Sequence, residues 1–233
     1  MPGSRGAIVL ADGAAPTRTM LDRAWPGWNV GLDLVVAADG GARHADALGL
    51  RIDVWVGDGD SVEPAQLSAI HAMGAEVRRV PVEKDQTDTE LAVVRAIDAG
   101  VKRLVILGAL GGRRLDHELA NVGLLWSARL SGVAAVLYDE RATRLSLLTA
   151  PDPAGLPVDR PLAGRVGDLV TLLPMGAAAR RVTTTNLRYP LAGEDLEAGR
   201  TRGVSNVRTA AVARVVLESG RLLVIETPVI VGS

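Results

Sequence analysis

The chain has 233 residues, 48% of them hydrophobic, and a formal net charge of −1. This apolar content excludes an intrinsically disordered chain, and the near-zero charge removes the electrostatic basis for non-specific binding to nucleic acid or to a membrane surface. The sequence contains no cysteine, which excludes disulfides and thiolate metal sites and fits the cytoplasmic location that we expect. We expect no signal peptide and no membrane span, because every apolar run is too short for either.

Short apolar runs alternate with helical patterns through the first part of the chain. The runs that we expect to form strands are 7–10, 34–38, 54–56, 77–80, 104–107 and 133–137. Between them, apolar residues recur every three or four positions in 67–73, 91–97 and 115–126, which predicts helices. Thr87 and Glu90 form a capping box, so a helix should begin near Asp88. This alternation predicts an α/β domain over residues 1–142, with a mostly parallel sheet between two helical layers.

The pattern changes after Tyr138. Residues 149–161 contain four prolines and are expected to form a connecting loop. The following strand-like runs are 169–173, 182–185, 209–217 and 222–226. No helical period longer than one turn occurs among them. We therefore expect residues 143–233 to form a separate all-β domain, a sandwich.

Three aspartates in two short loops carry the main functional signal. Asp58 and Asp60 lie in Gly-Asp-Gly-Asp-Ser, and Asp88 ends Lys-Asp-Gln-Thr-Asp. Crowded carboxylates repel one another unless a cation offsets their charge, and oxygen ligands favour a hard divalent ion, above all Mg²⁺. We predict that these three residues are metal ligands and catalytic, and that the substrate carries phosphate. The alternative is structural: an Asx-turn with a cap by Ser61, and an Asp88 favoured by the helix dipole.

Further candidates lie in loops that follow other predicted strands. Phosphate- or nucleotide-binding roles are expected for Asp39, Gly40, Gly41, Lys84, Thr87, Gly111 and Arg113. These residues have plainer alternatives, since the glycines can form ordinary turns and Lys84 can be a solvated surface charge. Asp116, a further candidate, can simply be the N-cap of the following helix. Loops at the carboxyl ends of parallel strands gather along one edge of a sheet, so their joint occurrence favours a site there. Neither the Gly-x-x-x-x-Gly-Lys-Ser/Thr loop nor Gly-x-Gly-x-x-Gly is present, which excludes the usual triphosphatase and dinucleotide sites.

Several of these motifs occur together in a known order. Ala-Asp-Gly-Gly-Ala spans 38–42, Gly-Asp-x-Asp-Ser spans 57–61, Asp-x-Thr-Asp spans 85–88, and Gly-Gly-Arg-x-x-Asp-His spans 111–117, with Asn121 following. In the second part, Thr-Asn-Leu-Arg-Tyr-Pro-Leu spans 185–191, and Ser205-Asn206 precedes a further strand. In this order the motifs resemble those of the thiamin pyrophosphokinase family, over essentially the whole chain.

The resemblance implies transfer of the terminal diphosphate of ATP to the thiamin hydroxyl, with Mg²⁺ as cofactor and AMP as second product. It places thiamin against Leu187, Tyr189, Ser205 and Asn206 and gives Asp116 a role in orienting or deprotonating the alcohol. It also implies a homodimer, in which the acceptor lies between domains of two subunits, and neither a nucleic-acid nor a membrane partner.

Two departures from the family pattern concern the acceptor. Asn186 replaces a usual glycine, although asparagine tolerates a left-handed backbone. No aromatic residue follows Asn206, so Tyr189 is the candidate for stacking on a cationic ring. Three alternatives therefore stay open: a diphosphokinase acting on another alcohol, such as a hydroxymethyl-pterin; a non-catalytic Mg-nucleotide-binding regulatory protein; and a phosphohydrolase.

Overall fold

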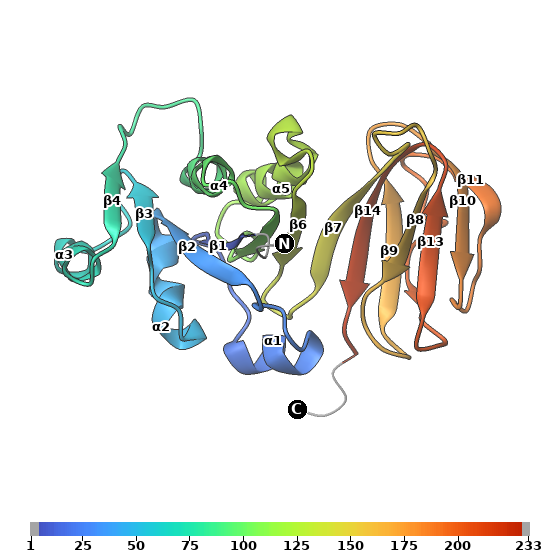
Figure 1. Ribbon diagram of the computed structural model, residues 1–233, viewed down its shortest axis with the longest axis horizontal. Helices are drawn as coiled ribbons and strands as arrows, with labels where there is room; N and C mark the ends of the chain where they lie inside the picture. Colours follow the sequence, from blue (N-terminus) through green and yellow to red (C-terminus); the bar gives the residue numbers. More distant parts are fainter. Residues whose placement is uncertain (1–4, 230–233) are drawn as a thin grey trace. The chain divides into compact units, whose positions relative to one another are not determined.

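The computed structural model describes residues 5–229. The chain divides into two compact units, and the boundary lies between Ala142 and Thr143 (Figure 1). No helix among residues 5–229 is long and apolar enough to cross a membrane.

The first unit is built on a parallel sheet. Its strands are β1 (Gly6–Leu10), β2 (Leu32–Ala38), β3 (Val54–Gly57), β4 (Glu76–Arg79), β5 (Arg103–Leu107) and β6 (Ala134–Tyr138). Their spatial order is β6-β5-β1-β2-β3-β4, and every pairing is parallel. All six predicted strands are confirmed, with ends shifted by one or two residues. Strand β1 is buried along its whole length, and β2 and β5 are apolar and buried except at their first residues, because helices cover both faces of the sheet.

Helices on both sides of the sheet confirm the three-layer arrangement. They are α1 (Arg18–Ala24), α2 (Ala45–Leu48), α3 (Pro64–Ala72), α4 (Asp88–Asp98) and α5 (Leu115–Gly123), with 3₁₀ turns η1 (Asp39–His44), η2 (Leu124–Trp126) and η3 (Ala128–Leu130). Figure 1 shows α4 and α5 on one side and α1 and α2 on the other. Because crossovers are right-handed, the reversal of direction after β4 moves the later helices to the opposite face. The pattern analysis did not predict α1 or α2.

Helix α4 begins where the capping box predicts. The Thr87 hydroxyl accepts a hydrogen bond from the Glu90 amide at 3.2 Å, and the first helical residue is Asp88. The buried face differs from the predicted apolar stripe, because it consists of Ala92, Val93 and Ala96. Small side chains let the helix approach strands β1 to β3 closely, which the larger residues of the stripe would prevent.

The apolar stripe that predicts helix α5 does not correspond to its buried face. Leu115 and Leu119 are 69% and 65% exposed. The helix is instead anchored by Asn121, whose side-chain amide donates to the Ala109 carbonyl at 2.9 Å. An apolar period therefore indicates the helix here, but it does not say what covers each face.

The second unit consists of two antiparallel sheets. One contains β7 (Arg144–Ala150), β9 (Leu169–Pro174), β12 (Asn206–Val207) and β14 (Gly220–Thr227), in the order β12-β9-β14-β7. The other contains β8 (Val158–Leu162), β10 (Ala179–Thr185), β11 (Ala192–Leu196) and β13 (Ala213–Leu217), in the order β11-β10-β13-β8. Apolar side chains from both sheets form one core. The predicted all-β sandwich is confirmed.

Two details of the sequence prediction are wrong in this unit. The proline-rich stretch 149–161 is not all loop, because it contains the end of β7 and most of β8. An edge strand tolerates proline, which lacks the amide that a central strand needs, and β8 lies at an edge of its sheet. The predicted strand 209–217 begins only at Ala213.

The backbone approaches itself closely where the loops after β1 and β5 meet. A Cβ at Gly108 would lie 2.2 Å from the Ala11 carbonyl oxygen, whereas a Cβ at Gly100 would contact nothing within 4 Å, and both glycines have positive φ angles. We predict that Gly108→Ala destabilises the protein by about 1–3 kcal/mol more than Gly100→Ala, because only Gly108→Ala adds overpacking to the backbone strain. Denaturant unfolding of both variants measures the difference, and equal losses would contradict the close approach.

Candidate active site

A buried carboxylate ties together the loops after β2 and β3. Asp39 follows β2 directly, with φ at +42°, and its side chain accepts hydrogen bonds from the amides of Gly59 and Ser61, both at 3.2 Å. The Trp55 indole donates to the Asp39 carbonyl at 3.1 Å. Burial raises the pKa of Asp39, the hydrogen bond from Ser61 opposes this, and the nearby carboxylates raise it further. Asp39 therefore shapes the acidic loop as well as adding a charge to it.

Asp58 and Asp60 point into the same small region as Asp39. The Asp58 carboxylate accepts from the Asp60 amide at 3.1 Å, and Gly59 between them has φ of +85°. This is an Asx-turn, so the structural alternative holds for the backbone. Ser61 does not cap α3, because its hydroxyl donates to Asp60 at 2.8 Å and the cap position is Glu63. One oxygen from each of the three aspartates lies within 4.8 Å of the others.

Lys84 joins Asp88 to this group. Its ammonium donates to Asp58 at 2.8 Å and lies 3.2 Å from Asp88 Oδ1. The hydrogen bond from Lys84 is the main cause that lowers the pKa of Asp58. Burial raises the pKa of Asp88 despite the same lysine, and Asp88 Oδ1 is sealed from solvent without a hydrogen bond of good geometry. Lys84 is therefore a partner of two carboxylates and not a solvated surface charge.

The loop after β1 contributes contacts that the sequence analysis missed. The Arg43 guanidinium forms an ion pair with Asp12 and donates to the carbonyls of Gly13 and Gly40, both at 3.0 Å. The His44 ring contacts the Gly13 carbonyl at 2.8 Å. Asp12-Gly13 follows a strand just as Asp39-Gly40 does, and this repetition was the available signal. These contacts hold the first and second loops side by side.

The glycine-rich loop after β5 is open to solvent near its arginines. Gly111 has φ of +70°, and Arg113 is exposed. Asp116 lies in the first turn of α5, whose cap is Arg114, so the predicted alternative of an N-cap is wrong. Instead Asp116 forms an ion pair with Arg114 at 2.5 Å, which lowers the pKa of that carboxyl.

In the second unit, the candidate acceptor residues surround one turn. Asn206 accepts from the Tyr189 amide at 2.9 Å and donates to the Tyr189 carbonyl at 2.6 Å. The Tyr189 side chain is 57% exposed, whereas Leu187 packs in the apolar core. Ser205, the residue before Asn206, has a left-handed conformation, with φ of +56°. Leu187 would therefore act by holding the turn in place.

The left-handed conformation expected of Asn186 is confirmed. Its φ is +59°, and its side chain donates to the Val212 carbonyl at 2.7 Å. The replacement of glycine by asparagine thus preserves the turn that presents Tyr189.

The acidic group has the donor set of a hard divalent cation. Asp39, Asp58 and Asp60 offer clustered carboxylate oxygens, and Asp88 adds a buried oxygen whose nearest cation is Lys84. Lys84 supplies one positive charge near these four carboxylates. A set made of carboxylates alone, without imidazole or thiolate, fits Mg²⁺ better than Zn²⁺.

Comparison with known proteins agrees with this architecture. The family model described as "Thiamin pyrophosphokinase, catalytic domain" matches residues 28–137, and that described as "Thiamin pyrophosphokinase, vitamin B1 binding domain" matches residues 158–222. The chain is 28% identical over 207 residues to "Thiamine pyrophosphokinase 1" of Oryza sativa subsp. japonica, covering 80% of this chain and 76% of that protein. It is 26% identical over 150 residues to "Thiamine pyrophosphokinase" of Bacillus subtilis (strain 168), covering 64% of this chain and 66% of that protein.

Solved structures share the fold over nearly the whole chain. The crystal structure of thiamine pyrophosphokinase from Bacillus subtilis superimposes with a TM-score of 0.80 at 21% identity, covering 96% of this chain and 99% of that one. The crystal structure of a thiamin pyrophosphokinase family protein from Enterococcus faecalis superimposes with a TM-score of 0.76 at 25% identity, covering 96% of this chain and 99% of that one.

Fold, acidic loops and family models together define an ATP-dependent diphosphotransferase. The chain belongs to the thiamin pyrophosphokinase family, because the two models of that family match both of its units. The family resemblance stated from the motifs is thereby confirmed.

The carboxylates around Lys84 generate a prediction for the metal-free protein. Lys84→Met should lower the melting temperature at pH 7, because Asp58 and Asp88 lose their shared cation. Asp58, whose pKa is lowered, contributes stability at neutral pH that is lost only as pH falls through its folded-state pKa. Asp88, whose pKa is raised, takes up a proton before an aspartate of ordinary pKa does as the pH falls.

As the pH falls, the deficit caused by Lys84→Met should therefore shrink in two stages: the Asp88 part above the usual aspartate pKa of about 4, and the Asp58 part below it. Thermal unfolding in EDTA measures it. The exposed lysine Lys102, changed to Met, is the matched control and should leave the melting temperature nearly unchanged. A deficit independent of pH would show that Lys84 contributes only packing.

Proposed function

We propose that this protein transfers the diphosphate of ATP to the hydroxyl of thiamin, giving thiamin diphosphate and AMP. One observation carries the proposal: Asp39, Asp58 and Asp60 cluster at the carboxyl edge of the sheet, where open α/β sheets bind ligands, and Lys84 links Asp88 to Asp58. Membership of the family supports the choice of thiamin as acceptor.

Asp58, Asp60 and Asp88 would hold Mg²⁺, and Asp39 would complete the set or keep the loop in place. Bound there, Mg²⁺ would neutralise charge on the polyphosphate, including charge that develops on the departing AMP. The protein's own contribution is to pre-organise these carboxylates. The hydrogen bonds of Asp39 to two backbone amides do this without a ligand.

Other groups along the same edge would position the nucleotide and its phosphates. They are Gly40, Gly41, Lys84, Thr87, Gly111 and Arg113. The hydroxyl of Thr87 is engaged in capping α4, so its amide is the group left for phosphate. Arg113 is exposed in a flexible glycine-rich turn, where a planar guanidinium can pair with phosphate oxygens.

The alcohol would attack the β-phosphorus of ATP, with AMP as leaving group. Asp116 would orient that alcohol, but its ion pair with Arg114 and its lowered pKa make it a poor proton acceptor at neutral pH. We therefore propose that Asp116 positions the hydroxyl. It can do so when a phosphate of the substrate pairs with Arg114 and releases the Asp116 carboxylate.

The acceptor would lie against Tyr189, with Ser205 and Asn206 beside it and Leu187 beneath the turn. A cationic thiazolium ring is attracted to the face of an aromatic side chain. We propose a homodimer as the assembly that completes this pocket. The exposed Leu115 and Leu119 on α5 support a subunit contact, since a second copy would remove them from water.

The identity of the nucleotide product tests the reaction. Incubation with ATP, Mg²⁺ and thiamin should yield AMP and thiamin diphosphate in equal amounts, because the bond broken is between the α- and β-phosphates. Chromatography of the products distinguishes the alternatives. ADP would indicate a simple kinase, phosphate release that thiamin does not divert would indicate a hydrolase, and a lack of turnover would favour a binding protein.

Loss of a metal-site carboxylate should abolish turnover without unfolding the chain. We predict that Asp58→Asn and Asp88→Asn each lower kcat at saturating ATP by roughly 10²-fold or more, because each removes charge from the polyphosphate site. Asp98→Asn changes an exposed aspartate at the other end of α4 and serves as the control. Steady-state kinetics at limiting Mg²⁺ and circular dichroism provide the measurements. Near-wild-type turnover of either site variant would remove it from the metal site.

Tyr189 should affect the acceptor and not the nucleotide. Tyr189→Ala removes the stacking face and is expected to raise the KM for thiamin about tenfold, whereas Tyr189→Phe keeps the face and should change it little. The KM for ATP should stay constant in both variants. Equal effects on the two substrates would place Tyr189 outside the acceptor pocket.

A further inference from the structure

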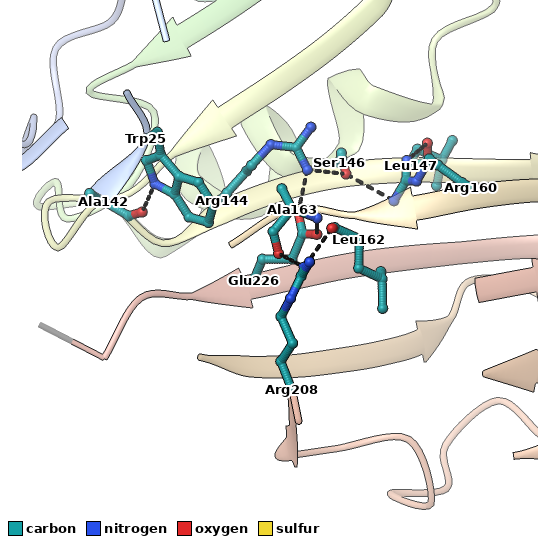
Figure 2. A network of polar contacts seen from close by, with 10 residues as sticks. All are labelled: Trp25, Ala142, Arg144, Ser146, Leu147, Arg160, Leu162, Ala163, Arg208 and Glu226. Atoms are coloured by element: carbon teal, nitrogen blue, oxygen red, sulfur yellow. Dashed lines mark hydrogen bonds and ion pairs between the residues drawn. The ribbon is translucent and has the colours of Figure 1, made fainter. Parts of the chain in front are cut away.

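A group of buried and half-buried charges lies in the second unit, apart from the residues assigned to the reaction. On β7, Ser146 faces the interior together with Leu148, because alternate residues of a strand share a face. Glu226 of β14 is paired in register with Arg144 of β7. Towards this end of the two strands the apolar core thus gives way to charged and hydroxyl side chains (Figure 2).

This group contains more positive than negative charge. Arg144, Arg160 and Arg208 gather around Glu226, which is 1% exposed. The Arg144 guanidinium forms an ion pair with Glu226, but within residues 5–229 no carboxylate lies within 4.0 Å of the guanidinium of Arg160 or Arg208. Three cations and one anion leave an excess of two positive charges, which is costly in a poorly solvated place.

The acceptors of the group are already used. One Glu226 oxygen accepts from Arg144, and the other accepts from the Ala163 amide at 2.5 Å. Arg208 donates to the carbonyls of Leu162 at 2.5 Å and Ala163 at 2.8 Å. Arg208 is thus satisfied by neutral carbonyls, and Arg160 donates to the Leu147 carbonyl and the Ser146 hydroxyl but not to Glu226.

Donors, by contrast, are left over around Ser146, which is 3% exposed. Its hydroxyl oxygen accepts from Arg160 at 3.2 Å and from Arg144 at 3.4 Å, so its own proton needs another acceptor. In Figure 2 one terminal nitrogen of Arg144 makes the contacts, and the other points away from them.

The spare nitrogens are not completely sealed from solvent. Among described residues that are not exposed, the only side-chain polar atoms both sealed from solvent and lacking a hydrogen bond belong to Asp88 and Arg95. Both terminal nitrogens of Arg160 donate, one to the Leu147 carbonyl at 3.2 Å and one to Ser146. The nitrogens without a hydrogen bond, Nε of Arg160 and Nε and one terminal nitrogen of Arg144, are therefore not sealed from solvent. Burial lowers the pKa of Arg160 to about 10, with the Glu226 charge opposing this and the Arg144 charge adding to it, so Arg160 is still a cation at neutral pH.

We propose that Ser146, Arg144 and Arg160 bind a small tetrahedral oxyanion of the phosphate class. Such an ion accepts hydrogen bonds without donating strongly, which matches two guanidinium groups and a hydroxyl with unused protons. Its charge of about two would offset the excess of two cations. The site uses none of the residues assigned to nucleotide, metal or acceptor, and it is independent of the proposed reaction.

The test uses the full-length protein in EDTA, without ATP or thiamin, at constant ionic strength. Inorganic phosphate and sulfate should each raise the melting temperature in a saturable way, because a ligand that binds the folded state stabilises it. Acetate and chloride should not do so at the same ionic strength. Equal stabilisation by chloride would overturn the proposal, since it would show only general screening of charge.

Two variants locate the binding. Arg160→Gln should weaken phosphate binding at least about tenfold in calorimetry, since it removes a charge-assisted donor. Ser146→Ala keeps every charge and the backbone, and it should weaken binding about threefold to tenfold even if Arg160→Gln fails to fold. Arg221→Gln, an exposed arginine on β14 without a side-chain partner among described residues, is the matched control and should bind as wild type does.

Phosphate binding that both Arg160→Gln and Ser146→Ala retain unchanged would place the ion elsewhere, for example at the nucleotide site, and would overturn the proposal. Because turnover is not measured, a chain that failed to act on thiamin would still give a clear result here.

Discussion

The contact of the Asp39 carboxylate with the backbone of the next loop is the constraint on which the first unit's site depends. Two amides, those of Gly59 and Ser61, point at one buried carboxylate. Hydrogen bonds to a charged group contribute about 1.5–3 kcal/mol each, which opposes the repulsion among neighbouring carboxylates. Without them Asp58 and Asp60 would be free to separate. With them, the loop after β3 holds its acids together before any ligand arrives.

The strand order explains why five loops can contribute to one edge. Strand β1 lies between β5 and β2. The chain runs from β1 through β2 and β3 to β4 on one side and then returns to β5 and β6 on the other, so the loops after β1, β2 and β5 become neighbours. Arg43 fastens the first loop to the second, and the close approach at Gly108 fastens it to the loop after β5. Such a reversal point leaves a crevice at the carboxyl ends of the strands, and rigid flanking strands make the loops a stable frame for chemistry.

The two units deal with concentrated charge in opposite ways. In the first, carboxylates in partly exposed loops exceed the single nearby lysine, so the group attracts cations. In the second, guanidinium groups exceed the single carboxylate of Glu226 inside a sandwich. Both excesses are unfavourable for the isolated chain, and both are reduced by a counter-ion of defined charge. Both ligand sites that we propose therefore rest on a local imbalance of charge more than on the fold as such.

The sequence by itself determined the features that depend on near neighbours along the chain. These include the strands of the parallel sheet, the start of α4 at the Thr87 cap, the left-handed Asn186 and the acidic loops as candidate sites. The tertiary structure decided everything that depends on residues far apart. It showed that Asp39 organises the acidic loop, that small residues form the buried face of α4, and that Arg144 meets Glu226 across 82 positions. The reason is physical: backbone propensity acts over a few residues, whereas desolvation, ion pairing and close packing are set by whichever strands the fold places side by side.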